Sequence, residues 1–122
     1  MLEIDDSKTI SDLQEKFNLC YPNLKIEFYK KRHHWEDLSP ENEKWDPGML
    51  IGSIRKEHEP GFLEIKSWNK VGEIEKSFFE KFGLNVQIFF KSGKKWIQTG
   101  KSDNFIISSL HNRMNREFSI IL

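Results

Sequence analysis

The chain has 122 residues, of which 19 are basic and 19 acidic, so its formal net charge is zero. Proteins that bind nucleic acid or membrane surfaces by general electrostatics usually carry a basic excess, which this chain lacks. The ten Phe residues allow a core to form without metals or disulfides. A single cysteine, Cys20, excludes an internal disulfide framework. No stretch approaches the roughly 18 apolar residues that a membrane span needs, and we therefore expect a cytoplasmic protein.

The first half of the chain predicts a strand, a helix and a second strand. Apolar and acidic residues alternate over residues 2–5, which indicates a short strand. Apolar residues then recur every three or four positions, and this spacing predicts a helix that begins after Thr9. Thr9 is the expected N-cap, and Asp12 completes a capping box with Asp in place of Glu. Alternation over residues 24–29 predicts a strand that is buried on one side.

A long polar segment follows. Residues 32–47 contain two prolines and many charges, which predicts a long loop or a poorly formed hairpin. Residues 50–56 then predict a short helical turn. The second half predicts a strand at 62–66, a helix at 71–82, strands at 84–90 and 95–99, a short helix at 106–113 and a final strand at 118–122.

The two halves resemble each other at an offset of about 61 residues. Leu2-Glu3-Ile4 recurs as Leu63-Glu64-Ile65, the helix positions Ile10, Asp12, Leu13, Phe17 and Tyr21 match Val71, Glu73, Ile74, Phe78 and Phe82, residues 24–31 match 84–91, Trp35 matches Trp96, and residues 50–54 match 106–110. We therefore expect two α+β repeats, 1–66 and 62–122, that share the strand at 62–66 and are fused into one unit. The expected fold has helices packed on a mixed β-sheet.

Two resemblances follow from these motifs. Thr9-Ile-Ser-Asp-Leu13 and Asp46-Pro-Gly-Met-Leu-Ile-Gly-Ser-Ile-Arg55 make each half similar to the later part of a ubiquitin-like β-grasp domain, although the order of elements also fits a ferredoxin-like unit. The whole chain resembles a group of small uncharacterised bacterial proteins of Bacteroidetes type. The residues that carry this second resemblance are Thr9–Leu13, Leu24–Phe28 and Leu84–Gly93. It implies no activity, cofactor or catalytic residue.

Two basic, Trp-flanked turns are the strongest candidates for a functional surface. The candidate residues are Lys30, Lys31, Arg32, His33, His34, Trp35, Trp45, Lys94, Lys95 and Trp96. Basic residues interleaved with aromatics can hold phosphates and stack bases. The alternative interpretation is that the turns are simply solvated and that Trp35 and Trp45 fold back as loop anchors.

The sequence contains no recognisable catalytic or metal-binding pattern. His33 and His34 are adjacent and would point in opposite directions on an extended segment, so they are poorly placed to share a metal ion. Cys20 lies at the end of the first predicted helix, where a lone cysteine is usually buried packing. We expect no cofactor, no metal and no enzymatic activity.

These observations favour a non-enzymatic protein-interaction module that acts through sheet edges or the 32–47 loop. The alternative is a binder of nucleic acid or another polyanion that uses the two basic turns. The expected partner is another protein. Strand 2–5 or strand 118–122 could pair between chains, which leaves a monomer and a small homo-oligomer both open.

Overall fold

The computed structural model describes residues 1–32, 38–99 and 105–107. In chain order its elements are β1 (Leu2–Ile4), α1 (Ile10–Cys20), β2 (Leu24–Tyr29), the 3-10 helix η1 (Glu41–Glu43), α2 (Ile51–Ile54), β3 (Gly61–Leu63), α3 (Val71–Phe82), β4 (Asn85–Ser92) and β5 (Lys95–Gln98). The fold is α+β, as the sequence predicted. The strand expected at residues 62–66 is shorter and begins one residue earlier, at Gly61.

The strands form two separate sheets. β1 pairs with β3 in a two-stranded ribbon, and β2, β4 and β5 form a three-stranded sheet in that order. Every strand pair among the described residues is antiparallel, so the prediction of a mixed sheet is wrong. The reason is that β2 and β4, which each follow the long helix of their own half, run in opposite directions where they pair.

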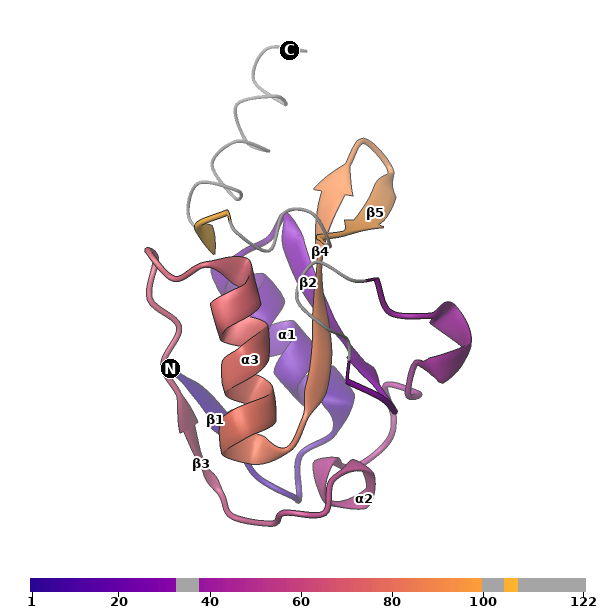
Figure 1. The fold of residues 1–122 in the computed structure, drawn as a ribbon, viewed down its shortest axis with the longest axis vertical. Coiled ribbons are helices and arrows are strands. Elements are labelled where there is room, and N and C mark those ends of the chain that lie inside the picture. The colour runs from indigo at the N-terminus through magenta and orange to yellow at the C-terminus, as the bar shows by residue number, and fades with distance from the viewer. Residues whose placement is uncertain (33–37, 100–104, 108–122) are drawn as a thin grey trace.

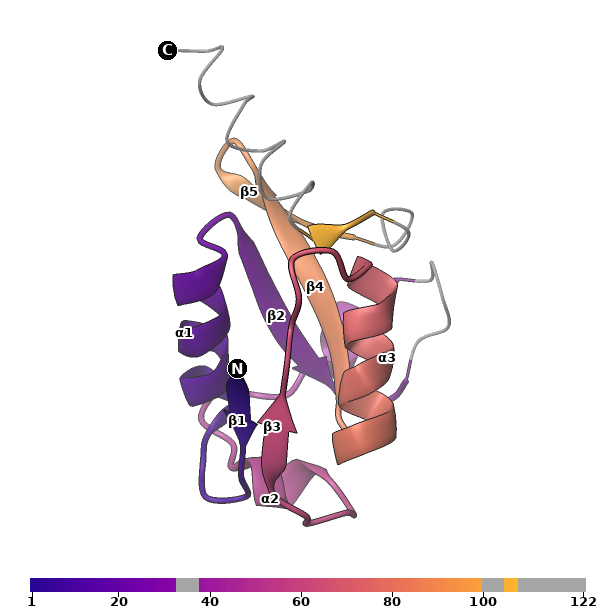
Figure 2. The ribbon, with the colours of Figure 1, turned by 90° about the vertical axis from the view of Figure 1, so that its left-hand side faces the viewer.

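The two long helices share one face of the three-stranded sheet (Figure 1). In Figure 2, α1 and α3 stand on either side, the three-stranded sheet lies behind them, and the β1–β3 ribbon lies in front of the space between them. One core fills this arrangement and draws on both halves of the chain. Its buried members are Leu2, Ile4, Ile10, Leu13, Phe17, Leu24, Ile26, Phe28, Ile51, Leu63, Val71, Ile74, Phe78, Phe82, Leu84, Val86, Ile88 and Ile107.

Strand pairing joins residues that the sequence comparison equates. Leu2 on β1 lies opposite Leu63 on β3, at the offset of 61 that aligns these strands. Glu27 on β2 lies opposite Gln87 on β4, at the offset of 60 that aligns those strands. Each pair therefore joins one position of the first half to its counterpart in the second half.

A second correspondence lies at the starts of the helices. The backbone N–H of Ile51 donates to the carbonyl of Lys8 over 2.8 Å, and that of Ile107 donates to the carbonyl of Asn69 over the same distance. Ile51 and Ile107 are both 0% exposed. In each half, therefore, the segment that lies beside the start of the long helix places one isoleucine in the core.

The helix ends follow the sequence signals. The Asp12 carboxylate accepts from the backbone N–H of Thr9, and the Thr9 hydroxyl accepts from the backbone N–H of Asp12, so the predicted capping box is confirmed. The Glu73 carboxylate likewise accepts from the backbone N–H of Lys70 over 3.0 Å. α3 ends at Gly83, which has a positive φ of 66°, as a left-handed C-terminal residue requires.

The polar segment after β2 returns along that strand. The backbone N–H of Lys30 donates to the carbonyl of Glu43 over 2.9 Å, and that of Trp45 donates to the carbonyl of Phe28 over 2.8 Å. Residues 43–45 thus run antiparallel to the end of β2, in line with the hairpin alternative for the 32–47 segment.

Some expected elements fall outside the described residues. These are most of the short helix at 106–113 and the whole strand at 118–122. None of the helices in the described ranges is long and apolar enough to cross a membrane.

Candidate functional site

The two basic turns lie at opposite ends of the three-stranded sheet. Asn85, at the start of β4, donates its side-chain N–H to the carbonyl of Lys30, which fixes the first turn beside that end. The second turn joins β4 to β5 at the other end, where the N–H of Lys91 donates to the carbonyl of Asn23. The length of β4 separates the turns by about 20 Å, at about 3.3 Å for each residue. The described residues of the two turns therefore do not form one continuous basic surface.

Several of the basic side chains are engaged within the molecule. The Lys30 ammonium lies 5.2 Å from the ring centre of Trp45, and the Arg32 guanidinium lies 4.0 Å from that of Phe79. Lys31 is 3.5 Å from the Glu43 carboxylate. All three residues nevertheless stay exposed to solvent, where contacts of this kind are weak.

The remaining predicted residues divide into three groups. Trp45 is partly buried and packs against the core, which favours the loop-anchor interpretation over an exposed contact residue. Trp96 is also partly buried, with the Lys25 ammonium 5.0 Å from its ring centre, while Lys94 and Lys95 are exposed. His33, His34 and Trp35 lie outside the described residues.

A different surface exposes large apolar side chains. Met1 is 87% exposed, Leu19 on α1 is 77% exposed and Phe62 on β3 is 60% exposed. All three line one groove of about 430 Å³ between α1 and the β1–β3 ribbon, with Glu15 and Lys16 of α1 also on its wall. We call these five residues the α1–ribbon face. Contiguous apolar side chains that stay exposed are a feature of protein-contact surfaces.

Sequence patterns carried a weak signal for this face. Leu19 is apolar but lies off the buried stripe of α1, whose buried members are Ile10, Leu13 and Phe17. Phe62 is exposed while its neighbour Leu63 is buried, so Phe62 lies on the outer side of β3. Neither residue alone would have been singled out, because isolated exposed apolar residues are common.

A smaller groove adjoins the α1–ribbon face and includes the cysteine. It holds about 190 Å³ and shares Met1 and Lys16 with the larger groove, while Cys20 and Tyr21 line its other side. Cys20 is exposed, so the expectation that it is buried packing is wrong. It follows Leu19 at the last turn of α1, and the helix face turned toward the core ends with Phe17. Burial, with a smaller contribution from Cys20, raises the pKa of the Tyr21 hydroxyl.

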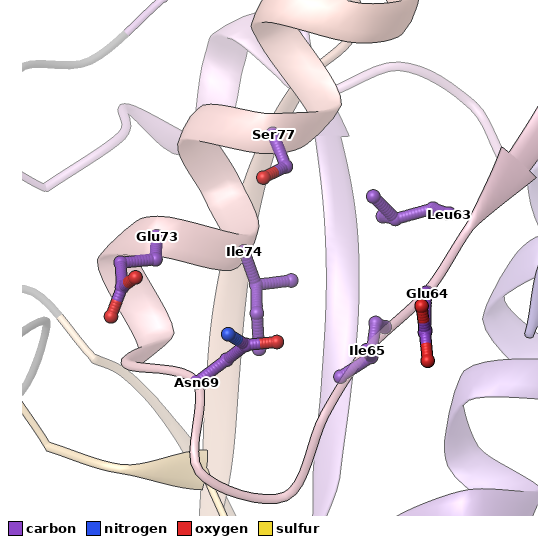
Figure 3. Close-up of a pocket in the computed structure, with 7 residues that line it drawn as sticks. All are labelled: Leu63, Glu64, Ile65, Asn69, Glu73, Ile74 and Ser77. Carbon is purple, nitrogen blue, oxygen red and sulfur yellow. The ribbon is translucent and has the colours of Figure 1, made fainter.

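The second half presents a corresponding but polar surface. At the offset of 61, Leu19 corresponds to Glu80 and Glu15 to Lys76, and these two α3 residues pair with each other over 3.7 Å. The hollow between α3 and β3 holds only about 60 Å³. Figure 3 shows Ile74 and Ser77 of α3 across this space from Leu63 and Ile65. Among the described residues, α3 therefore has no apolar counterpart of this surface beside it.

One titratable cluster lies apart from both surfaces. The buried guanidinium of Arg55 is 2.7 Å from Asp6 Oδ1, and Nδ1 of the exposed His58 is 2.7 Å from Asp6 Oδ2. Burial raises the pKa of Asp6, but the hydrogen bonds from Arg55 and His58 outweigh it, and the pKa lies below its ordinary value. Arg55 also donates to the carbonyl of Phe82 over 3.3 Å. Among the described residues no hydroxyl or thiol is hydrogen-bonded to His58, and the cluster ties the β1–α1 turn to α2 and α3.

The described part of the chain contains no group of three or more His, Cys, Asp and Glu side chains that could hold a metal ion. Comparison of the whole chain with protein-family models, with curated proteins and with solved structures found no match.

Proposed function

We propose that this chain is a non-enzymatic protein-interaction module whose binding surface is the α1–ribbon face. One observation carries the proposal: Met1, Leu19 and Phe62 are all mostly exposed and line a single groove. Burying one such side chain contributes about 1.5–3 kcal/mol, so three neighbours provide a substantial driving force for association. The exposed thiol of Cys20 suits the reducing cytoplasm, where we place the protein.

The contrast between the two long helices supports this choice of surface. The position that holds Leu19 in α1 holds Glu80 in α3, where the side chain forms an ion pair with Lys76. A solvated helix face normally carries such charges. At the corresponding place α1 instead exposes Leu19, beside the exposed Phe62 and Met1, and a contiguous apolar group of this kind suits a protein contact better than solvent.

We also propose that the chain arose as two copies of one α+β unit related by an approximate two-fold axis. The pairing of Leu2 with Leu63 and of Glu27 with Gln87 supports this, because a two-fold axis brings equivalent positions together. The β-grasp resemblance of each half stays a prediction. Duplication would give two related surfaces, one beside α1 and one beside α3. We propose that only the surface beside α1 binds a partner.

The polyanion alternative has less support. Its two basic turns stand about 20 Å apart at opposite ends of a sheet, and Lys30, Lys31 and Arg32 already contact aromatic or acidic side chains.

The experiment compares three forms of the full chain in pull-downs from the native cell lysate. Leu19→Arg removes the apolar side chain at the last turn of α1, where a positive charge suits the helix dipole. Glu80→Gln changes the net charge by the same amount at the corresponding place on α3. We expect the wild type and Glu80→Gln to retain the same partner and Leu19→Arg to lose it. Equal recovery by all three forms would contradict the proposal.

A further inference from the structure

We infer that the partner on the α1–ribbon face is a second copy of this chain, packed about a two-fold axis. The inference rests on the proposed function, because it names the occupant of the same surface. It is argued from the charges that border the groove and from the charge of the whole chain.

Three of the charged groups that line the groove are already satisfied within one copy. The Lys8 ammonium lies 3.4 Å from the Glu3 carboxylate. The Asp12 carboxylate accepts from the backbone N–H of Thr9 over 2.9 Å. These groups need no partner from another molecule.

The two charges nearest to Leu19 on α1 differ from these. Among the described residues neither Glu15 nor Lys16 makes an ion pair, although both line the groove. The face therefore offers one free carboxylate and one free ammonium beside its apolar side chains. In α3 the residue that corresponds to Glu15 is Lys76, and it pairs within the helix.

A surface that carries one free charge of each sign complements itself under a two-fold axis. In such an interface the same patch contributes from both copies, so the Glu15 carboxylate of one copy can face the Lys16 ammonium of the other, and the reverse. A partner with charge of one sign would leave either Glu15 or Lys16 opposed by a like charge. The formal net charge of zero also means that two copies do not repel each other at long range. The same contact covers Met1, Leu19 and Phe62 of both copies at once.

Sedimentation equilibrium of the full chain over a wide range of concentration tests the inference. We expect the wild type and Glu80→Gln to associate to a dimer with the same affinity. Leu19→Arg should weaken the dimer at least about tenfold, which corresponds to the loss of one buried apolar side chain. Phe62→Thr, which places a β-branched residue with high strand propensity on the exposed side of β3, should weaken it as well. Far-ultraviolet circular dichroism checks that each variant is folded.

A charge exchange distinguishes a second copy from any other partner. Glu15→Lys alone and Lys16→Glu alone should each weaken the dimer, because each places like charges opposite one another. The double variant Glu15→Lys/Lys16→Glu should recover affinity, since both copies change together. A short bismaleimide should also link the exposed Cys20 thiols of the wild type and of Glu80→Gln, and link Leu19→Arg much less.

The outcomes separate this inference from the proposed function. A wild type that stays monomeric at all concentrations overturns the inference. If that monomer still captures a different protein and Leu19→Arg abolishes the capture, the proposed function stands although the inference of a dimer is overturned. A dimer that is unaffected by Leu19→Arg and Phe62→Thr overturns the inference as well, because it would use another face.

Discussion

Glu27 on β2 lies directly opposite Gln87 on β4, and these two residues occupy the same position in the two halves of the chain. Both side chains are largely buried: the Glu27 carboxylate accepts from the side-chain amide of Gln14 on α1, and the Gln87 amide donates to the Thr99 hydroxyl. The likeness between the halves makes their differences informative. The difference on which the proposed function rests is at the ends of the long helices, where Leu19 in one half corresponds to Glu80 in the other.

The first prediction concerns the paired isoleucines. Ile51→Ala and Ile107→Ala should each lower the free energy of unfolding by about 2–5 kcal/mol, because each side chain is fully buried and its removal leaves a cavity. Denaturant titration measures both. Leu50→Ala is the control, since Leu50 is about half exposed and should cost much less. If Ile107→Ala were as stable as the wild type, Ile107 would not contribute to the core as Ile51 does.

The second prediction concerns acid stability. The pKa of Asp6 in the folded chain lies below its ordinary value of 3.8, so the folded state binds a proton at Asp6 less readily than the unfolded state. The stabilisation is therefore present above about pH 4 and is lost as the pH falls through the lowered pKa. Thermal unfolding from pH 7 to pH 2 should show this loss in the wild type.

Asp6→Asn should be less stable at pH 7, because the buried Arg55 guanidinium loses its carboxylate. Its stability should also fall less as the medium is acidified. Glu57→Gln is the matched control at an exposed carboxylate. If the stability of Asp6→Asn fell with pH as steeply as that of the wild type, the acid sensitivity would come from another carboxylate.

The third prediction separates anchoring from binding at Trp45. Trp45 packs against the core and carries the Lys30 ammonium over its ring. Trp45→Ala should therefore destabilise the fold by roughly 2 kcal/mol, less than a fully buried Trp would. Partner capture at a temperature where the variant is folded should be unchanged. Loss of the partner without loss of stability would make Trp45 a contact residue.

The sequence indicated most of the regular structure because its signals are local. The Thr9 and Asp12 capping box, the apolar spacing of α3 and the left-handed Gly83 depend on neighbouring residues alone. Each was therefore predictable from spacing and residue type.

The sheet and the candidate surface depend on contacts between distant residues. Whether β2 meets β4 parallel or antiparallel is decided by how the two halves turn toward each other, and no local pattern records that. The cluster of Asp6, Arg55 and His58 joins residues about 50 positions apart. Leu19 and Phe62 become one surface only when α1 packs beside the β1–β3 ribbon. The two basic turns looked related in the sequence, and the antiparallel sheet places them at opposite ends.

The central claim is that the α1–ribbon face is a binding surface, and site-specific photo-crosslinking in living cells tests it most directly. One form of the full chain carries a benzophenone amino acid in place of Leu19, and the matched form carries it in place of Glu80. We expect irradiation to yield one discrete cross-linked species from position 19 and none from position 80, and mass spectrometry of that species reports whether it contains a second copy of the chain. Absence of a cross-link from position 19, or the same products from both positions, would contradict the claim.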